Sequence, residues 1–231
     1  SGGIGRSLVL SLINNKSIAT VYTGSRTSLG QHPKAANHLH VDLENEESIK
    51  KSAEIIQSSV ECLDIVLLAT GILWRGSDLL PEKNLQSLNL NCLEEVFKVN
   101  TFGPAIVMKY FLPMLNKNQK SVFAVISAKV GSIQDNRLGG WYGYRSSKTA
   151  LNMMIKTASI ELRRKNALAI CVALHPGTVD TALSSPFRNS VSSSVLVSPD
   201  TAAGNLLRVI DKLSVDDTGG FFSWNGERIP Y

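Results

Sequence analysis

The sequence predicts an α/β fold in which a doubly wound, parallel β-sheet carries helices on both faces, in three layers. Short runs rich in β-branched residues alternate along the chain with longer amphipathic segments, and this alternation is typical of βαβ units. The length of 231 residues, 43% of them hydrophobic, suits one domain with a substantial core. We therefore expect residues 1–231 to form a single domain without repeats or a linker.

Strand-like and helix-like segments can be placed in order along the chain. The strand-like runs are SIATVYTG from Ser17, HLHV from His38, LDIVLLAT from Leu63, SVFAVIS from Ser121, LAICVALHP from Leu168 and GFFSW from Gly220. Helical periodicity occupies residues 5–14, 46–57, 91–116, 142–165 and 199–212. Each helix therefore lies between two predicted strands.

The chain begins with SGGIG, which looks like the end of a glycine-rich turn between a first strand and its helix. The strand itself is absent from this sequence, so the first strand of the predicted sheet is missing. A doubly wound sheet without that central strand has unpaired edges on both neighbours. We therefore expect about ten further residues, mostly apolar, ahead of Ser1 in the natural chain.

Composition excludes several classes of protein. The apolar runs at residues 63–69 and 168–174 are far too short to span a membrane. The net charge of +5 is spread along the chain without a nucleic-acid-binding motif. The three cysteines are far apart in apolar surroundings, which favours reduced thiols in the cytoplasm. The histidines have no set of acids nearby, so we expect no metal site.

The start of the chain and the end of the second strand both suggest a dinucleotide site. Gly2, Gly3 and Gly5, with Ile4 between them, open a helix whose N-terminus can bind a pyrophosphate, although glycines also mark ordinary turns. The second strand ends in TGSRTS, without an acid for a ribose hydroxyl. Ser25 and Arg26, with Thr27 as an extra donor, favour the 2'-phosphate of NADP(H) over NAD(H). The alternative for Arg26 is an ordinary surface arginine.

Two further patterns have both a functional and a purely structural interpretation. Asp42, followed by Leu43 in HVDL, suits a contact to an adenine edge, but an aspartate there could equally begin the next helix. Tyr144 and Lys148 are four residues apart and share one face of a predicted helix. A neighbouring positive charge lowers the pKa of a tyrosine toward working pH, which a proton donor needs, but the same spacing also fits a solvated helix face.

Taken together and in order, these motifs resemble those of the classical short-chain dehydrogenase/reductases, which have a Rossmann fold. The resemblance covers nearly the full length, and it is strongest to the C-factor and Sniffer-like carbonyl reductase branch. The segments that carry the resemblance to that branch are GGWYGYRSSKTALNMM, HPGTVDTAL and FFSWNGERIPY.

The resemblance implies a role for each matching residue. Tyr144 would protonate the substrate carbonyl, and Lys148 would hold the nicotinamide ribose and lower the pKa of Tyr144. Asn100, in VNTFGP, would kink its helix and hold a water that connects Lys148 to solvent. The nicotinamide pocket would be formed by Pro176, Gly177, Val179 and Thr181.

Two positions depart from the family pattern. The usual NNAG is LATG here, so Ala69, Thr70 and Gly71 would line the cofactor with less polar bracing than usual. The place of the usual serine is taken by Ala128, which leaves Ser127 and Ser132 as candidates. Strand alternation points Ser127 away from the direction of Ala128, so Ser132 is favoured.

The sequence therefore predicts an NADP(H)-dependent reductase of aldehydes or ketones. The alternative is an NADP(H)-binding signalling or redox-sensing protein with little turnover. The altered LATG and the displaced serine both favour this alternative. The segment ALSSPFRNSVSSSVLV is expected to form a lid over a small-molecule substrate. The resemblance also implies a homodimer or tetramer that pairs through residues 91–116 and 142–165.

Overall fold

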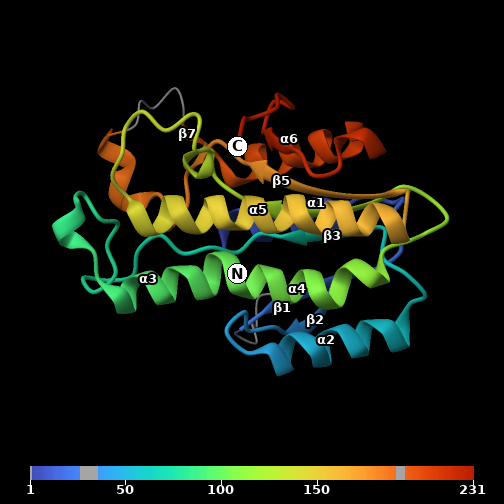
Figure 1. Ribbon diagram of the computed structural model, residues 1–231. Coiled ribbons are helices and arrows are strands. Elements are labelled where there is room, and N and C mark those ends of the chain that lie inside the picture. The colour runs from blue at the N-terminus through green and yellow to red at the C-terminus, as the bar shows by residue number, and fades with distance from the viewer. Residues whose placement is uncertain (1, 27–35, 191–195) are drawn as a thin grey trace.

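The computed structural model describes residues 2–26, 36–190 and 196–231, and it confirms the predicted α/β class (Figure 1). Within these residues, no helix combines the length and the apolar character that crossing a membrane requires. The helices are α1 (Gly3–Ile13), α2 (Glu46–Ser59), α3 (Leu90–Phe97), α4 (Gly103–Phe111), α5 (Tyr142–Lys165) and α6 (Pro199–Lys212). The strands are β1 (Val21–Ser25), β2 (Ala36–His40), β3 (Ile65–Leu68), β4 (Ser121–Ile126), β5 (Ala169–His175), β6 (Thr178–Val179), β7 (Leu196–Val197) and β8 (Phe221–Ser223).

All strand pairs are parallel, as the alternating pattern predicts, but they form separate ladders. One sheet has the order β3-β4-β5-β8, another pairs β1 with β2, and a third pairs β6 with β7. In the longest ladder Ser121 is opposite Ala169 and Ile126 is opposite Leu174. No ladder joins β1 to β3 within the described part of the chain, and both strands are less buried than β4 and β5. The expected upstream strand stays a prediction.

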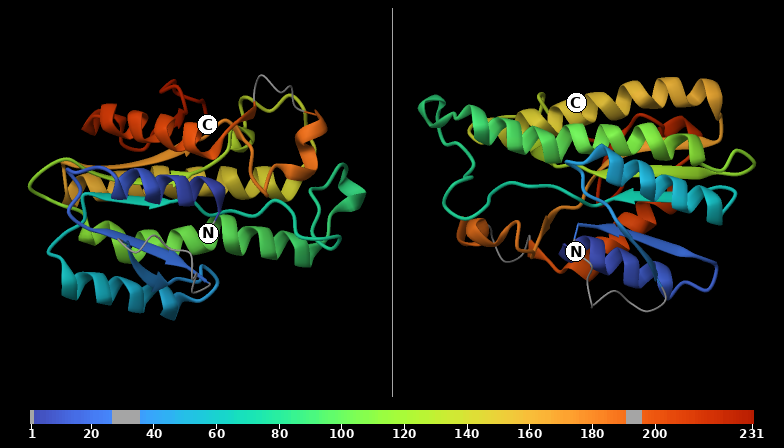
Figure 2. Two further views of the ribbon diagram at one scale, coloured as in Figure 1. Left: turned by 180° about the vertical axis from the view of Figure 1, so that it is seen from behind. Right: turned by 90° about the horizontal axis from the view of Figure 1, so that it is seen from below.

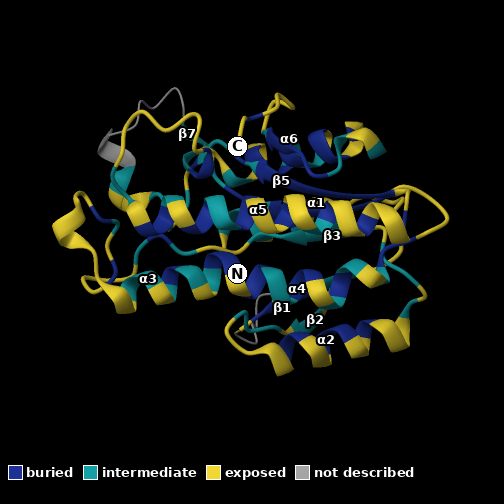
Figure 3. Cartoon of the chain, viewed as in Figure 1, coloured by how far each residue is buried: buried dark blue, intermediate teal, exposed yellow. Residues whose placement is uncertain are grey.

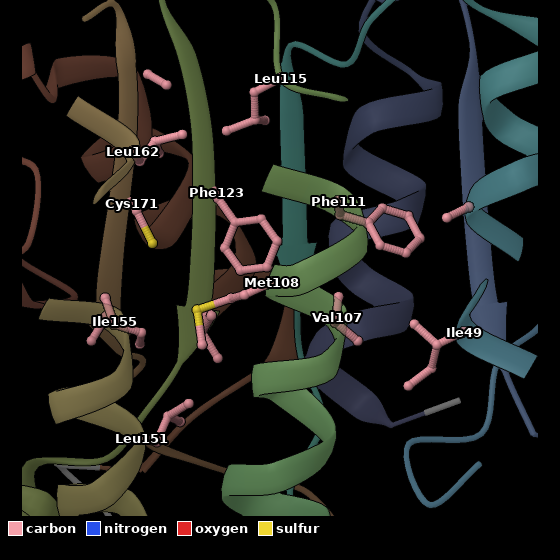
Figure 4. Close-up of a cluster of buried hydrophobic side chains, with 14 of the residues drawn as sticks. Ile49, Val107, Met108, Phe111, Leu115, Phe123, Leu151, Ile155, Leu162 and Cys171 are labelled. Carbon is pink, nitrogen blue, oxygen red and sulfur yellow. The ribbon is translucent and has the colours of Figure 1, made fainter. Parts of the chain in front are cut away.

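Helices cover the sheets on both faces. On one face α2, α4 and α5 pack over a core centred on Phe123, whose side chain is 0% exposed (Figure 4). On the other face α1 and α6 pack against each other and over the opposite side of β4 and β5 (Figure 2). Burial follows stripes along each helix, with exposed residues on the outer side (Figure 3). Alternate residues of β4 and β5 thus enter different cores, as expected for strands buried on both faces.

The predicted helix at residues 91–116 is not continuous. Between α3 and α4 the chain adopts a π-helical segment, Lys98–Phe102, and a 3₁₀ turn follows at Leu112–Met114. The π-helical segment buries the side chains of Asn100 and Thr101, and Thr101 Oγ1 donates to the carbonyl of Ser147 at 2.8 Å. Such segments are frequent at functional sites because they turn side chains out of the regular helical spacing.

Candidate active site

Tyr144 and Lys148 both lie on the buried face of α5. Their side chains are 8% and 2% exposed, so the reading of this pair as a solvated helix face is wrong. Lys148 Nζ lies 6.0 Å from the centre of the Tyr144 ring and donates to the carbonyl oxygen of Ile126 at 3.1 Å. The lysine therefore connects α5 to the C-terminal end of β4, the edge at which parallel sheets bind ligands.

Asn100 joins the π-helical segment to the loop after β3. Its Oδ1 accepts from the backbone N–H of Ile72 at 2.8 Å, and its Nδ2 donates to the carbonyl of Ile72 at 2.8 Å and to Ser147 Oγ at 3.1 Å. A Cβ on Gly71 would lie 3.3 Å from both Asn100 Oδ1 and Lys148 Nζ. Gly71 therefore lies against the side chains of Asn100 and Lys148.

Burial governs the proton affinities of the pair. It raises the pKa of Tyr144 to about 12 and lowers the pKa of Lys148 to about 8, because each charged form loses water. The lowering of the Tyr144 pKa that the resemblance assigns to Lys148 stays a prediction.

The two candidate serines are both buried, at 2% exposure for Ser127 and 1% for Ser132. Ser127 Oγ donates to Asn152 Oδ1 at 2.7 Å, so its proton is already used in a hydrogen bond to a residue of α5. Ser132 Oγ accepts from the N–H of Asp135 at 3.1 Å and keeps its own proton for another acceptor. Within the described residues, neither serine has a hydrogen bond to Tyr144.

The glycine turn lies where three distant segments meet. A Cβ on Gly3 would lie 2.9 Å from Thr181 Cγ2, and one on Gly5 would lie 3.7 Å from the Cβ of Ala69. Ile4 packs into the core beneath α6. The turn, the LATG segment and the segment after β5 are therefore neighbours, as a shared cofactor site requires.

The backbone at the start of α1 is open to an anion. Among residues 2–26, 36–190 and 196–231 no side chain caps this helix, and its first turn holds no acidic residue, so the first N–H groups keep their hydrogen-bonding capacity. A Cβ on Gly2 would meet nothing within 4 Å, which leaves space in front of these groups. An uncapped helix N-terminus with open space ahead of it fits a pyrophosphate.

The residues predicted to select NADP(H) lie at the end of β1. Ser25 is buried, whereas Arg26 is exposed and forms an ion pair with Glu44 at 3.6 Å. Asp42 Oδ1 accepts from the N–H of Glu44 at 3.1 Å in the turn before α2, and Asn45, not Asp42, caps that helix. Leu43 packs against Gly103, where an added Cβ would lie 2.5 Å from Leu43 Cβ. Thr27 lies outside the described residues.

The segment after β5 is closely packed. Gly177, after Pro176, has a φ of +81°, and a Cβ there would lie 3.1 Å from Trp224 Cδ1. Val179 is buried, and its carbonyl accepts from Ser184 Oγ at 2.6 Å. Only glycine can satisfy both the backbone angle and the indole contact at residue 177.

Two tryptophans connect the predicted lid to the surroundings of Tyr144. The Trp141 ring lies 6.2 Å from that of Tyr144 and 5.0 Å from that of Phe187, which belongs to the predicted lid. Trp74 Nε1 donates to the carbonyl of Leu183 at 3.0 Å. The described part of the expected lid therefore contacts both α5 and the loop after β3; its residues 191–195 lie outside the described chain.

The sequence reasoning missed two residues that contact the start of α5. Ser147 Oγ donates to the carbonyl of Tyr144 at 2.9 Å and accepts from Asn100. The Glu82 carboxylate accepts from the N–H of Gly143 at 3.1 Å. The sequence does indicate that this helix has no local cap, because WYGY contains no Ser, Thr, Asp or Asn. Which distant residue supplies the cap is not readable from the sequence.

Comparison with known proteins gives consistent results. A family model described as short chain dehydrogenase matches residues 1–191. C-signal of Myxococcus xanthus is 35% identical over 139 residues, which cover 60% of this chain and 78% of that protein. The carbonyl reductase Sniffer of D. melanogaster superimposes with a TM-score of 0.85 at 26% identity, over 100% of this chain and 96% of that one. The NADPH-bound carbonyl reductase from chicken fatty liver gives 0.86 at 27% identity, over 100% and 91%.

Proposed function

This chain belongs to the short-chain dehydrogenase family, and from that premise we propose that it reduces the carbonyl group of an aldehyde or ketone with NADPH. The predicted resemblance to this family and to its C-factor and Sniffer-like branch is confirmed. The observation that carries the proposal is a buried cluster in which Lys148 and Asn100 lie beside Gly71 and the Lys148 ammonium lies 6.0 Å from the centre of the buried Tyr144 ring. This cluster lies at the C-terminal edge of the sheet, where such folds bind ligands.

Tyr144 is the proposed general acid. Its raised pKa, about 12, keeps the phenol protonated at neutral pH, so that it can donate a proton to a carbonyl oxygen. Oxidation of an alcohol would use the phenolate of Tyr144 as the base.

The cofactor supplies the hydride when it is bound, and the protein supplies the proton and the orientation. The Tyr144 hydroxyl would protonate the carbonyl oxygen as its carbon is reduced, so that the product would be an alcohol. Lys148, within reach of Gly71 and Ile126, is placed to hold ribose hydroxyls and to return a proton to Tyr144. Asn100, bonded to both backbone groups of Ile72, keeps this loop in register with α5.

The preference for NADP(H) rests on Arg26, which is exposed at the end of β1 beside Glu44. A guanidinium group there fits a 2'-phosphate, and an exposed ion pair with Glu44 is weak enough to be exchanged for it. The chicken carbonyl reductase, which is similar over its fold and sequence, is NADPH-bound. We propose that Arg26 distinguishes the two cofactors and that the uncapped start of α1 binds the pyrophosphate.

A second candidate function has one observation in its favour. Ala128 occupies the place of the usual serine, and Ser127 is committed to Asn152. A site without a serine hydroxyl beside Tyr144 would bind NADPH and turn over slowly, as a signalling or redox-sensing protein would.

One experiment separates these candidates. Nicotinamide fluorescence is followed while the protein is titrated with NADPH and, separately, with NADH; turnover is then measured on a panel of aldehydes and ketones. The reductase proposal requires tighter NADPH binding and turnover of at least one carbonyl. Binding without turnover supports the second candidate, and failure to bind either nucleotide contradicts both.

We further propose that the protein works in the cytoplasm as a homodimer. Apolar side chains remain exposed on the outer faces of α5 and of the π-helical segment, namely Phe102, Met153, Met154 and Ile160. Light scattering at low protein concentration tests this assembly, and a monomer would contradict it.

A further inference from the structure

The catalytic helix α5 begins without a local cap. Its N-cap residue, Trp141, has a left-handed φ of 52° and provides no side-chain hydrogen bond. Helices α2 and α6 follow the usual rule, since Asn45 caps α2 through the N–H of Ser48 and Ser198 caps α6 through the N–H of Thr201. The first N–H groups of α5 therefore need acceptors from elsewhere.

Glu82, which lies sixty-one residues before Gly143 in the loop after β3, supplies them. Its backbone carbonyl accepts from the N–H of Trp141 at 2.5 Å, and its carboxylate Oε2 accepts from the N–H of Gly143 at 3.1 Å. One residue thus accepts hydrogen bonds from two backbone N–H groups at the start of α5. Tyr144 is the next residue after this pair of contacts.

Burial and charge make this contact more important for the start of α5 than a helix cap on the protein surface would be. Glu82 is 6% exposed, and within the described residues no lysine or arginine lies within ion-pair distance of its carboxylate. The positive end of the α5 dipole is therefore its compensating partner. A buried carboxylate without that partner would carry a large desolvation cost.

The two sides of the contact constrain each other. A Cβ on Gly143 would lie 2.8 Å from Glu82 Oε1 and 3.0 Å from Leu93 Cδ2. Any larger residue at position 143 would therefore push the carboxylate away from the helix. Gly143 is needed here for close approach and not for an unusual backbone angle, since it lies within the helix.

We propose that Glu82 is a positioning residue for Tyr144: it holds the first turn of α5 so that the phenol points at the substrate carbonyl. This inference rests on the proposed reductase function, because it assigns Tyr144 as the proton donor. The Trp141 ring, 6.2 Å from that of Tyr144, is set by the same two contacts. Displacement of this turn misdirects the hydroxyl while the cofactor residues on α1 and after β5 stay in place.

Three variants at one position separate geometry from charge. Glu82→Gln keeps an oxygen of the same reach, whereas Glu82→Asp keeps the charge and shortens the side chain, and Glu82→Ala removes both. We expect kcat to fall about tenfold or more in the Asp and Ala variants and to stay within about threefold of the wild-type value in the Gln variant. The Kd for NADPH should change by less than about twofold in all three.

A matched control is the loss of a cap elsewhere. Asn89 caps α3 through the N–H of Cys92 at 3.2 Å, so Asn89→Ala removes a comparable hydrogen bond away from Tyr144. It should lower the melting temperature and leave kcat unchanged. If Glu82→Asp and Glu82→Ala keep kcat within about twofold of wild type, or if Glu82→Gln loses as much as Glu82→Ala, the inference is wrong.

Amide hydrogen exchange tests the contact without relying on turnover. In the wild-type protein the N–H of Gly143, which donates to the Glu82 carboxylate, should be protected, and in Glu82→Asp it should exchange at least about tenfold faster while the middle of α5 is unchanged. Unchanged exchange at this amide overturns the inference even if the wild type turns out to be inactive. Wild-type inactivity with faster exchange in the variant contradicts only the reductase function.

Discussion

The ammonium group of Lys148 donates to the carbonyl oxygen of Ile126, the last residue of β4, at 3.1 Å. This bond holds the long lysine side chain at the end of the central ladder, 3.3 Å from where a Cβ of Gly71 would lie. A buried lysine with one fixed acceptor is oriented rather than mobile, because each unsatisfied donor in the interior costs free energy. The position of the Lys148 ammonium group is therefore set by a backbone carbonyl and not by a carboxylate within the described residues.

Replacement of Tyr144 by phenylalanine tests the general acid. The variant removes one hydroxyl from a buried ring, so the fold and the NADPH affinity should be kept while kcat falls by about 10²–10⁴-fold. Steady-state turnover and fluorescence titration measure the two quantities. Tyr142→Phe, at a half-exposed neighbour, is the control and should leave kcat unchanged. Retained turnover in Tyr144→Phe would remove Tyr144 from the mechanism.

The buried charge of Lys148 predicts how stability depends on pH. Its folded-state pKa of about 8 lies below the ordinary lysine value of 10.5, so Lys148 binds more protons in the unfolded chain between those values. The contribution of Lys148 to the free energy of unfolding should therefore rise with pH across this window. Between about pH 7.5 and 9.5 the wild type should gain roughly 2 kcal/mol relative to Lys148→Met.

Urea denaturation of both proteins at the two pH values measures this difference. The raised pKa of Tyr144, about 12, acts in the opposite direction only above pH 10, outside the chosen range. A wild-type protein that loses stability relative to Lys148→Met as the pH rises would contradict the burial of a depressed lysine.

A methyl group at Gly71 should disturb the site directly. In Gly71→Ala the new Cβ would lie 3.3 Å from Asn100 Oδ1 and Lys148 Nζ, which is tighter than ordinary contact. We expect kcat/KM for a carbonyl substrate to fall by about tenfold or more. Gly204→Ala is the matched control, because a Cβ there meets nothing within 4 Å in helix α6. It should keep full activity and stabilise the helix by about 0.5–1 kcal/mol.

Arg26→Ala should lower the affinity for NADPH about tenfold or more and leave that for NADH nearly unchanged. Glu44→Gln breaks the same exposed ion pair and keeps the guanidinium free, so it should not weaken NADPH binding. Fluorescence titrations with both nucleotides distinguish the variants. Equal losses for NADPH and NADH in Arg26→Ala would mean that Arg26 does not read the 2'-phosphate.

The two serines are expected to respond differently. Ser132→Ala removes the hydroxyl that keeps a free proton and should lower kcat by about 10²-fold. Ser127→Ala breaks the bond to Asn152 Oδ1 and should cost about 1 kcal/mol of stability with kcat largely kept. Steady-state kinetics and chemical denaturation of both variants test this. The reverse pattern would assign the role to Ser127, and no effect from either would favour the low-turnover function.

Local chemistry explains which elements were predictable. Helix α5 begins and ends as predicted at Tyr142 and Lys165, because a long amphipathic run with basic residues in its last turn is a strong local signal. The strand expected from Ser17 begins only at Val21, and the helix at 91–116 is interrupted around Asn100, where the resemblance implied a kink. Periodicity alone gives neither the start of β1 nor this interruption.

The sequence by itself determined the alternation of strands and helices, the family resemblance, and the four-residue spacing that gives Tyr144 and Lys148 one face. These are properties of neighbours along the chain, governed by backbone geometry and side-chain patterning. Only the tertiary structure decided that desolvation raises the pKa of Tyr144 to about 12 and that Glu82 caps the helix that carries it. Burial and contacts between distant residues depend on how the elements pack, and no local pattern contains that information.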